Sequence, residues 1–343
     1  MHSTIAIDQS FQQAISDQVF SGAQLLAGRG EKRLFEGCYG TVSWVEGAPA
    51  VTETTLFDLA SLTKPLATTP LILKLHESKQ LNLDDLVQKY LPTFARREEI
   101  TLRHLLSHTS GLPAYLPLFE EFRNEASPRE KVRDRFIEEI HQVTLEAQVG
   151  EKRIYSDLGF ILLGFILEEI GESPLDELFY REIVPQYGLS GLNFHPLPYH
   201  GETEDIAATE ACAWRNKTLQ GEVHDDNAYV LGGVAGHAGL FGNAGAVEKF
   251  IHALWELWDK GKTVDPDLGW DRVSRPKSQA GKFFGEEAFG HLAFTGCSLW
   301  LDPVDQKYVV LLCNRVHPGR EGETIKSFRP KIHDVLLEQL GLT

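Results

Sequence analysis

The segment Ser61-Leu62-Thr63-Lys64 stands where a long apolar run begins, and it constrains the fold and the chemistry of this chain more than any other segment. Residues three apart share one face of a helix. In a helix, the hydroxyl of Ser61 and the amine of Lys64 therefore lie side by side. A serine next to a potential base is the arrangement of an activated nucleophile.

The same spacing recurs at Ser274 and Lys277, so the surroundings decide between the two. The residues after Ser61 are apolar enough to predict a buried helix, kinked at Pro70. Polar residues and a proline around Ser274 predict a loop instead. At a helix start, free backbone N–H groups favour an oxyanion and disfavour a charged lysine. We therefore expect Ser61 to be the nucleophile.

Charge excludes several classes of partner. The 343 residues include 49 acidic and 33 basic ones, a formal net charge of -16, and no basic cluster interrupts this excess. Neither nucleic acid nor an anionic membrane is an expected partner. Hydrophobic residues make up 42%, which is enough for a globular core in one large or two smaller domains.

The N-terminal residues 1–8 show no basic region followed by an apolar one. No segment approaches the roughly 18 apolar residues that a membrane-spanning helix needs. These two observations predict a cytoplasmic protein that does not enter a membrane.

The cysteines and histidines do not predict a metal site. Cys38, Cys212, Cys297 and Cys313 are scattered without a C-x-x-C pair, which fits reduced thiols. His104 and His108 have the spacing of a metal-binding pair, but no glutamate lies between them.

Both ends of the chain predict strands. Residues 8–20 favour an opening helix, and residues 22–27 and 32–39 flank a glycine-containing turn as a hairpin. Near the other end, residues 292–301 and 307–313 favour a second hairpin, and residues 324–340 an amphipathic closing helix.

The middle of the chain is mostly helical in pattern. Thr101 can cap a short helix through Leu106, Ser173-Pro174 can start another, and residues 158–170 form a strongly apolar candidate. We expect one mixed sheet built from both ends and covered by helices, with an inserted helical region. Residues 1–79 and 240–343 would form the α/β sheet region and residues 80–239 the helical region, with the active site at their junction.

A serine and lysine pair needs a further proton-transfer group. Tyr155-Ser156-Asp157 directly precedes the apolar helix candidate, where side chains can point into a cleft. Tyr155 could relay a proton between Ser61 and a leaving group. Alternatively, Tyr155 is a half-buried packing residue and Asp157 the helix cap.

An oxyanion hole is also needed, and Gly290-His291-Leu292-Ala293-Phe294-Thr295-Gly296 is the candidate. Backbone N–H groups of an edge strand there could act together with the N–H of Ser61, and His291 would face the cleft. The segment 224–227 and His237 lie in glycine-rich surroundings and could line the same cleft, or could only stabilise turns.

Together these segments resemble the serine β-lactamases and penicillin-binding proteins, and within them the class C β-lactamase-like hydrolases and family VIII esterases. The family order S-x-x-K, Y-x-N and H-x-G reads here Ser61 to Lys64, Tyr155 to Asp157 and His291 to Ala293. Residues 101–113 and 233–241 are similar to the same family.

The resemblance implies an α/β (α+β) fold, with an antiparallel sheet covered by helices on both faces and an all-helical region. It implies a covalent acyl-enzyme without metal or cofactor. By motif, Ser61 is the nucleophile, Lys64 its activator, and Tyr155 a general base and then acid. The N–H groups of Ser61 and Phe294 would form the oxyanion hole.

Three positions depart from the family pattern. His291 replaces a common lysine that helps bind a substrate carboxylate, and Asp157 replaces an asparagine. Asp157 near Lys64 would favour the ammonium form and shift proton transfer toward Tyr155. Ala293 replaces a glycine, so its methyl group should narrow the cleft. In an alternative frame, Phe294-Thr295-Gly296 is the third motif.

These departures predict a serine hydrolase, a carboxylesterase or amidase, that prefers neutral ester or amide substrates. The alternatives are a D-amino-acid peptidase or β-lactamase acting on a peptide-like substrate, and a binding or sensing module that captures an acyl donor without turnover. The sequence makes no prediction of the oligomeric state.

Overall fold

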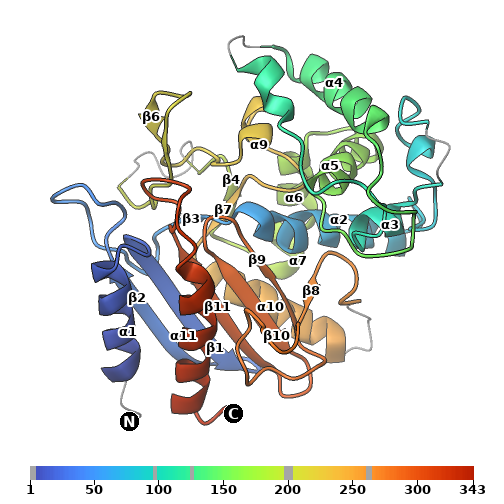
Figure 1. Cartoon of the computed structure of the whole chain (residues 1–343). Coiled ribbons are helices and arrows are strands. Elements are labelled where there is room, and N and C mark those ends of the chain that lie inside the picture. Colours follow the sequence, from blue (N-terminus) through green and yellow to red (C-terminus); the bar gives the residue numbers. More distant parts are fainter. Residues whose placement is uncertain (1–4, 96–98, 124–126, 197–203, 260–264) are drawn as a thin grey trace.

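The computed structural model describes residues 5–95, 99–123, 127–196, 204–259 and 265–343. Its main feature is a six-stranded sheet in the order β2-β1-β11-β10-β9-β8, made only of strands from the two ends of the chain (Figure 1). The strands are β1 (Gly22–Arg29), β2 (Lys32–Gly40), β8 (Asp271–Arg272), β9 (Phe289–Leu292), β10 (Ser298–Asp302) and β11 (Lys307–Cys313).

Every ladder of this sheet is antiparallel, so the expectation of a mixed sheet is wrong and that of an antiparallel sheet is confirmed. Short turns between successive strands allow this, as at Gly30, whose φ of +59° suits a residue without a side chain. The second hairpin differs from its prediction. Leu292 ends β9, and a separate turn containing Gly296, at φ +108°, leads into β10.

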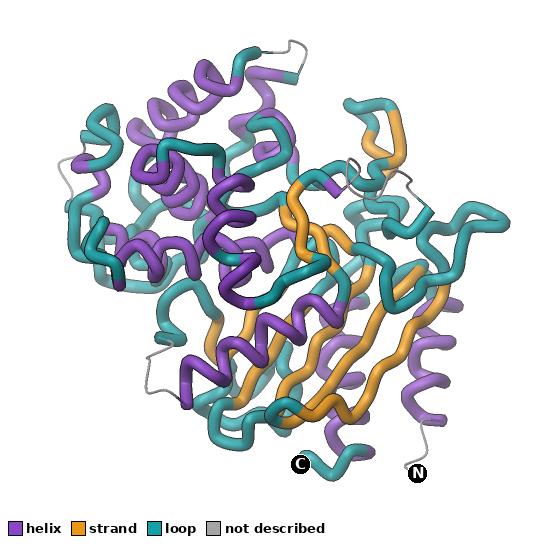
Figure 2. The backbone as a smooth tube through the Cα atoms, turned by 180° about the vertical axis from the view of Figure 1, so that it is seen from behind, coloured by secondary structure: helices purple, strands orange, loops and turns teal. Residues whose placement is uncertain are grey.

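Helices cover both faces of the sheet (Figures 1 and 2). The helices α1 (Ile5–Ser16) and α11 (Ile325–Gln339) lie on one face and α10 (Ala244–Asp259) on the other. The opening helix ends at Ser16, earlier than expected, because Gln18 has a left-handed φ of +55°. The core between the sheet and the helices α1 and α11 includes the buried side chains of Phe11, Phe20 and Leu336.

The helical region lies beside one end of the sheet (Figure 1). Its elements are η3 (Val87–Lys89), α3 (Leu102–Leu106), η4 (Leu118–Phe122), α4 (Arg129–Gln142), α5 (Asp157–Gly171), α6 (Leu175–Glu182), α7 (Val184–Tyr187) and α9 (Asp226–Val230). Thr101 caps α3 as expected. Ser156, not Asp157, caps α5, because its hydroxyl accepts the N–H of Gly159.

Short strands connect the two regions. A three-stranded sheet has the order β3-β7-β4, and its strands are β3 (Phe57–Asp58), β7 (Leu240–Gly242) and β4 (Leu192–Phe194). A two-stranded sheet consists of β5 (Ala211–Cys212) and β6 (Lys217–Thr218). β3 leads directly into the segment of Ser61, so pairing with β7 fixes where that segment begins.

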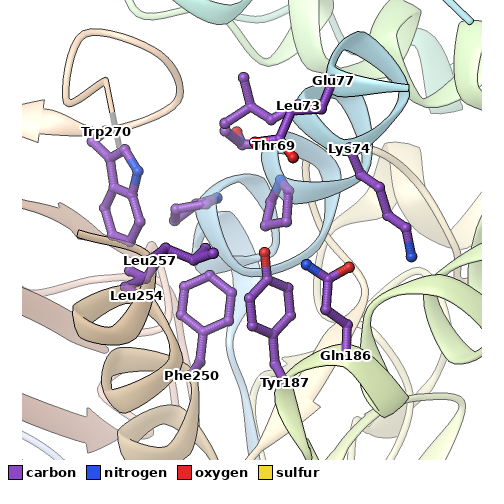
Figure 3. Close-up of a pocket in the computed structure, with 12 residues that line it drawn as sticks. Thr69, Leu73, Lys74, Glu77, Gln186, Tyr187, Phe250, Leu254, Leu257 and Trp270 are labelled. Carbon is purple, nitrogen blue, oxygen red and sulfur yellow. The ribbon is translucent and has the colours of Figure 1, made fainter. Parts of the chain in front are cut away.

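The Ser61 segment is not a regular α-helix. A 3₁₀ turn, η1 (Ala60–Leu62), is followed by a π-helical turn, η2 (Lys64–Thr68), and then by α2 (Thr69–Glu77). The wide turn places Pro70 in the first turn of α2, where its missing N–H costs nothing. The far side of α2 packs against α7, α10 and Trp270 around a cavity of about 60 Å³ (Figure 3).

Among the described residues, no helix has both the length and the apolar character needed to cross a membrane.

The buried imidazole of His333 should make the stability depend on pH. Burial on α11 lowers its pKa from 6.5 to about 3. Only the unfolded chain binds this proton below about pH 6.5, so the free energy of unfolding falls as the pH falls. We expect His333→Gln to remove about 2 kcal/mol of the stability lost between pH 7 and pH 5, measured by urea denaturation. Equal pH slopes for both proteins would contradict this assignment.

Candidate active site

Three side chains from two distant segments meet at Ser61. Lys64 Nζ donates a hydrogen bond of 3.0 Å to Ser61 Oγ, and the hydroxyl of Tyr155 donates another of 2.8 Å. The first contact follows from the local turn, and the second from α5, whose start brings Tyr155 to the end of β3. The structure therefore brings together the three residues that the first two motifs predicted.

Lys64 is fully buried, and its surroundings hold the ammonium group in place. Asp157 Oδ1 lies 2.7 Å from Nζ, and the carbonyl of His237 accepts a hydrogen bond of 3.2 Å from it. Nζ also lies 4.9 Å from the ring centre of Tyr155. With a carboxylate so close, we assign a charged ammonium to Lys64 in the resting protein.

Tyr155 is a neutral phenol in this site. Burial and the negative charge of Asp157 raise the pKa of its hydroxyl well above the ordinary value. The rings of His108 and His291 flank it, with ring centres 4.7 Å and 5.9 Å away. Burial lowers the pKa of both imidazoles, so neither carries a charge near pH 7.

The third segment lies opposite Ser61, at the end of β9. His291 is buried, with Nδ1 2.7 Å from the carbonyl of Leu292. Ala293 is 7% exposed and lines the cleft. Phe294 is 50% exposed, and within the described parts of the chain its backbone N–H has no hydrogen-bond acceptor. Because Ala293 and Phe294 both line the cleft, this N–H can donate to a ligand there.

The alternative frame of the third motif is disfavoured. Thr295 is buried, and its hydroxyl donates to the carbonyl of Asp58 rather than facing the cleft. Gly296 forms the turn behind it. His291 is therefore the motif residue closest to Tyr155.

A cleft of about 600 Å³ opens in front of these groups. Its wall includes residues that no motif predicted, among them Asp271, Gln279, Arg315, Lys326 and Arg329. They come from β8, from the segment between β8 and β9, from the segment after β11 and from α11, so only the folded chain brings them together.

The charges along this cleft are not evenly balanced. Its carboxylates are paired, Asp157 with Lys64, Asp271 with Arg153 at 2.9 Å, and Glu323 with Lys326. Among the residues that the structure describes, neither Arg315 nor Arg329 forms an ion pair with a carboxylate, and Glu323 acts on Arg315 only through its charge at longer range. The two guanidinium groups donate to oxygen atoms of Phe294, Arg320, Gly322, Gln279 and Gly296.

The segment 224–227 and His237 form hydrogen bonds beside the site and are not among the residues that line the cleft. His237 Nε2 lies 2.9 Å from Asp225, and His224 Nε2 lies 2.9 Å from Glu210. Asn227 holds the backbone of Leu116 and Phe119. The ring of His224 stacks on the ring of Phe294 at 5.7 Å.

The second serine and lysine pair does not line this cleft, whereas His108 of the histidine pair flanks Tyr155. The hydroxyl of Ser274 donates to the carbonyl of Lys277 in an exposed loop. His104 contacts its own helix cap at Thr101, and no cluster of three metal-binding side chains occurs in the described ranges.

Comparison with known sequences agrees with the family resemblance of the three motifs. The model of the protein family described as Beta-lactamase matches residues 7–330. The chain is 30% identical over 357 residues to the N-acetylmuramyl-L-alanine amidase of Bacillus subtilis (strain 168), covering 91% of this chain and 80% of the relative. It is also 30% identical over 353 residues to the "Putative D-alanyl-D-alanine carboxypeptidase" of Escherichia coli (strain K12), covering 88% and 81%.

Solved structures share the fold. EstCE1, described as a hydrolase with promiscuous acyltransferase activity, superposes with a TM-score of 0.74 at 22% identity, covering 97% of this chain and 98% of that chain. A class C beta lactamase superposes with a TM-score of 0.71 at 16% identity, covering 97% of both chains.

The ion pair of Lys64 and Asp157 can be tested by a double-mutant cycle. We expect Lys64→Met, Asp157→Asn and the double variant to give a coupling free energy of about 1 to 3 kcal/mol in urea denaturation, because Lys64 is buried. The exposed pair of Arg103 and Asp84, also 2.7 Å apart, is the matched control and should couple less. Equal coupling in both cycles would contradict a special role for burial.

Proposed function

The chain belongs to the beta-lactamase family, as its three motifs predicted, and on that basis we propose that it hydrolyses carboxylic esters or amides through an acyl-enzyme on Ser61. One observation carries the proposal: Ser61 Oγ lies within hydrogen-bond distance of both Lys64 Nζ and the Tyr155 hydroxyl. A serine hydrolase needs such neighbouring groups to remove the proton of the nucleophilic serine and to give a proton to the leaving group.

Tyr155 would act as a proton shuttle. Because its hydroxyl stays protonated near pH 7, it is not a free phenolate base at the outset. As Ser61 Oγ adds to the substrate carbonyl carbon, the Tyr155 hydroxyl turns its own proton from Ser61 toward the leaving oxygen or nitrogen and accepts the serine proton. When the bond between the carbonyl carbon and the leaving atom breaks, Tyr155 gives its original proton to that atom. One proton moves from Ser61 to the leaving group, and Tyr155 ends neutral. Lys64 stabilises the negative charge that develops on these oxygens.

The oxyanion would lie between the N–H groups of Ser61 and Phe294. The N–H of Phe294 has no internal acceptor in the described chain. The donors here come from a 3₁₀ turn and a strand end, so the earlier expectation of a helix dipole at Ser61 carries little weight. Water then attacks the acyl-enzyme by the reverse proton path.

A neutral substrate fits the groups nearest to Ser61. His291 is uncharged near pH 7, and Asp157 presents only acceptor atoms. An acyl group with a carboxylate close to Asp157 would be repelled.

A specific observation favours a second candidate, a peptidase for substrates that end in a carboxylate. Arg315 and Arg329 line the cleft beside the third segment, where they donate to the carbonyl groups of Phe294 and Gly296, and neither forms an ion pair among the described residues. A guanidinium group binds a carboxylate through two parallel hydrogen bonds. The Escherichia coli relative, named "Putative D-alanyl-D-alanine carboxypeptidase", is consistent with this candidate.

Removing the Tyr155 hydroxyl tests the shuttle. We expect Tyr155→Phe to slow acylation of Ser61 by about 100- to 10,000-fold, because among the described residues no other phenol forms a hydrogen bond with Oγ. The rate is measured as the burst phase with p-nitrophenyl butyrate. Tyr115→Phe removes a phenolic hydroxyl outside this hydrogen-bonded group and serves as the control. Near-normal acylation in Tyr155→Phe would exclude the shuttle.

Two matched esters test the substrate charge. We expect kcat/KM for p-nitrophenyl butyrate to exceed that for mono-p-nitrophenyl glutarate, which adds one carboxylate, by about tenfold or more. Nitrocefin should be a still poorer substrate. A preference for the glutarate ester that disappears in Arg315→Gln would favour the second candidate instead.

A further inference from the structure

Asp58 has a buried carboxyl group three residues before the nucleophile. The side chain is 2% exposed, at the end of β3, and among the described residues no lysine or arginine forms an ion pair with it. Burial raises the pKa of this carboxyl group. A buried acid without a cationic partner is costly, so its contacts need an explanation other than stability alone.

One carboxylate oxygen of Asp58 holds the residue before Ser61. Oδ1 accepts the N–H of Ala60 at 2.8 Å. Ala60 has a φ of +42°, in the left-handed region that a residue with a side chain rarely adopts. The hydrogen bond offsets this backbone strain and so fixes the direction in which the next peptide, with the N–H of Ser61, points.

The other polar atoms of Asp58 hold the opposite side of the cleft. Oδ2 accepts the N–H of His224 at 2.7 Å, and the ring of His224 stacks on that of Phe294. The carbonyl oxygen of Asp58 accepts the hydroxyl of Thr295 at 2.8 Å, directly after Phe294. Asp58 therefore contacts both Ala60, which precedes the N–H of Ser61, and Thr295, which follows the N–H of Phe294.

We propose that Asp58 is a positioning residue for the oxyanion hole, which sets the separation of the Ser61 and Phe294 N–H groups by holding Ala60 in its strained conformation and anchoring Thr295 and His224. This inference rests on the proposed acyl-enzyme at Ser61. No motif of the sequence included Asp58, and the residue does not contact the cleft itself.

The test measures how fast a fluorophosphonate probe labels Ser61, together with kcat and KM for p-nitrophenyl butyrate. Asp58→Asn keeps the shape but turns one acceptor into a donor that faces a backbone N–H. We expect a loss of about 10- to 100-fold in labelling rate and in kcat, with KM changed little, because only transition-state contacts move.

Glycine at position 60 separates positioning from a general loss of structure. Glycine adopts a positive φ without strain, so Asp58→Asn/Ala60→Gly should recover much of the activity that Asp58→Asn loses. A defect caused only by the lost contact with His224 would not be repaired by a change at position 60. Asp205→Asn is the matched control, since this carboxylate accepts hydrogen bonds from Thr54 and Thr55 near β3 but contacts neither Ala60 nor Thr295.

The outcomes are distinguishable. Labelling of Asp58→Asn within about twofold of the parent protein, or no recovery in the double variant, would overturn the positioning role while leaving the acyl-enzyme intact. Absence of labelling in the parent protein, or equal labelling of Ser61→Ala, would overturn the proposed function and with it this inference.

Discussion

The antiparallel ladder between β1 and β11 joins the two ends of the chain, and the geometry of the cleft depends on it. Ala23 pairs with Cys313 and Arg29 with Lys307. Asn314 extends this junction, because its side chain accepts the N–H groups of Ser21 and Gly22. Ser61 follows one partner of the ladder in sequence and Phe294 precedes the other. The ladder therefore brings the two segments into one region, and the local contacts of Asp58 with Ala60 and Thr295 then set the separation of their N–H groups.

Burial then decides which groups in the cleft carry charge. Lys64 has no exposed surface, and its ammonium group is compensated by one carboxylate at 2.7 Å. In the same low-dielectric surroundings, the Tyr155 phenol and the nearby imidazoles remain neutral. Next to Ser61, the described residues thus include the ion pair of Lys64 and Asp157 together with neutral groups that carry exchangeable protons. A shuttle that starts and ends with neutral Tyr155 uses these protons without creating a second buried charge.

Sequence reasoning reached the fold and the central groups because these depend on local patterns. The Ser61 and Lys64 spacing, the Thr101 cap and the strands at both ends all follow from residues close in sequence. It missed what depends on tertiary contacts. Ser156 replaces Asp157 as the cap because Asp157 pairs with Lys64, and the π-helical turn arises where two prolines lack N–H groups. Arg315, Arg329 and Asp58 have no local signature, because each also contacts residues distant in the chain: Phe294 for Arg315, Gly296 for Arg329, and His224 for Asp58.

The net charge of the chain says little about the charge of its substrate. A formal charge of -16 suggests that anions are repelled, yet at physiological ionic strength charges more than about 8 Å apart in water are largely screened. A substrate in the cleft therefore responds mainly to the groups that line it. There, Asp157 pairs with Lys64 beside Ser61, while Arg315 and Arg329 donate to the carbonyl groups of Phe294 and Gly296 in the third segment. The position of a negative group along the substrate, more than its presence, should decide whether the cleft accepts it.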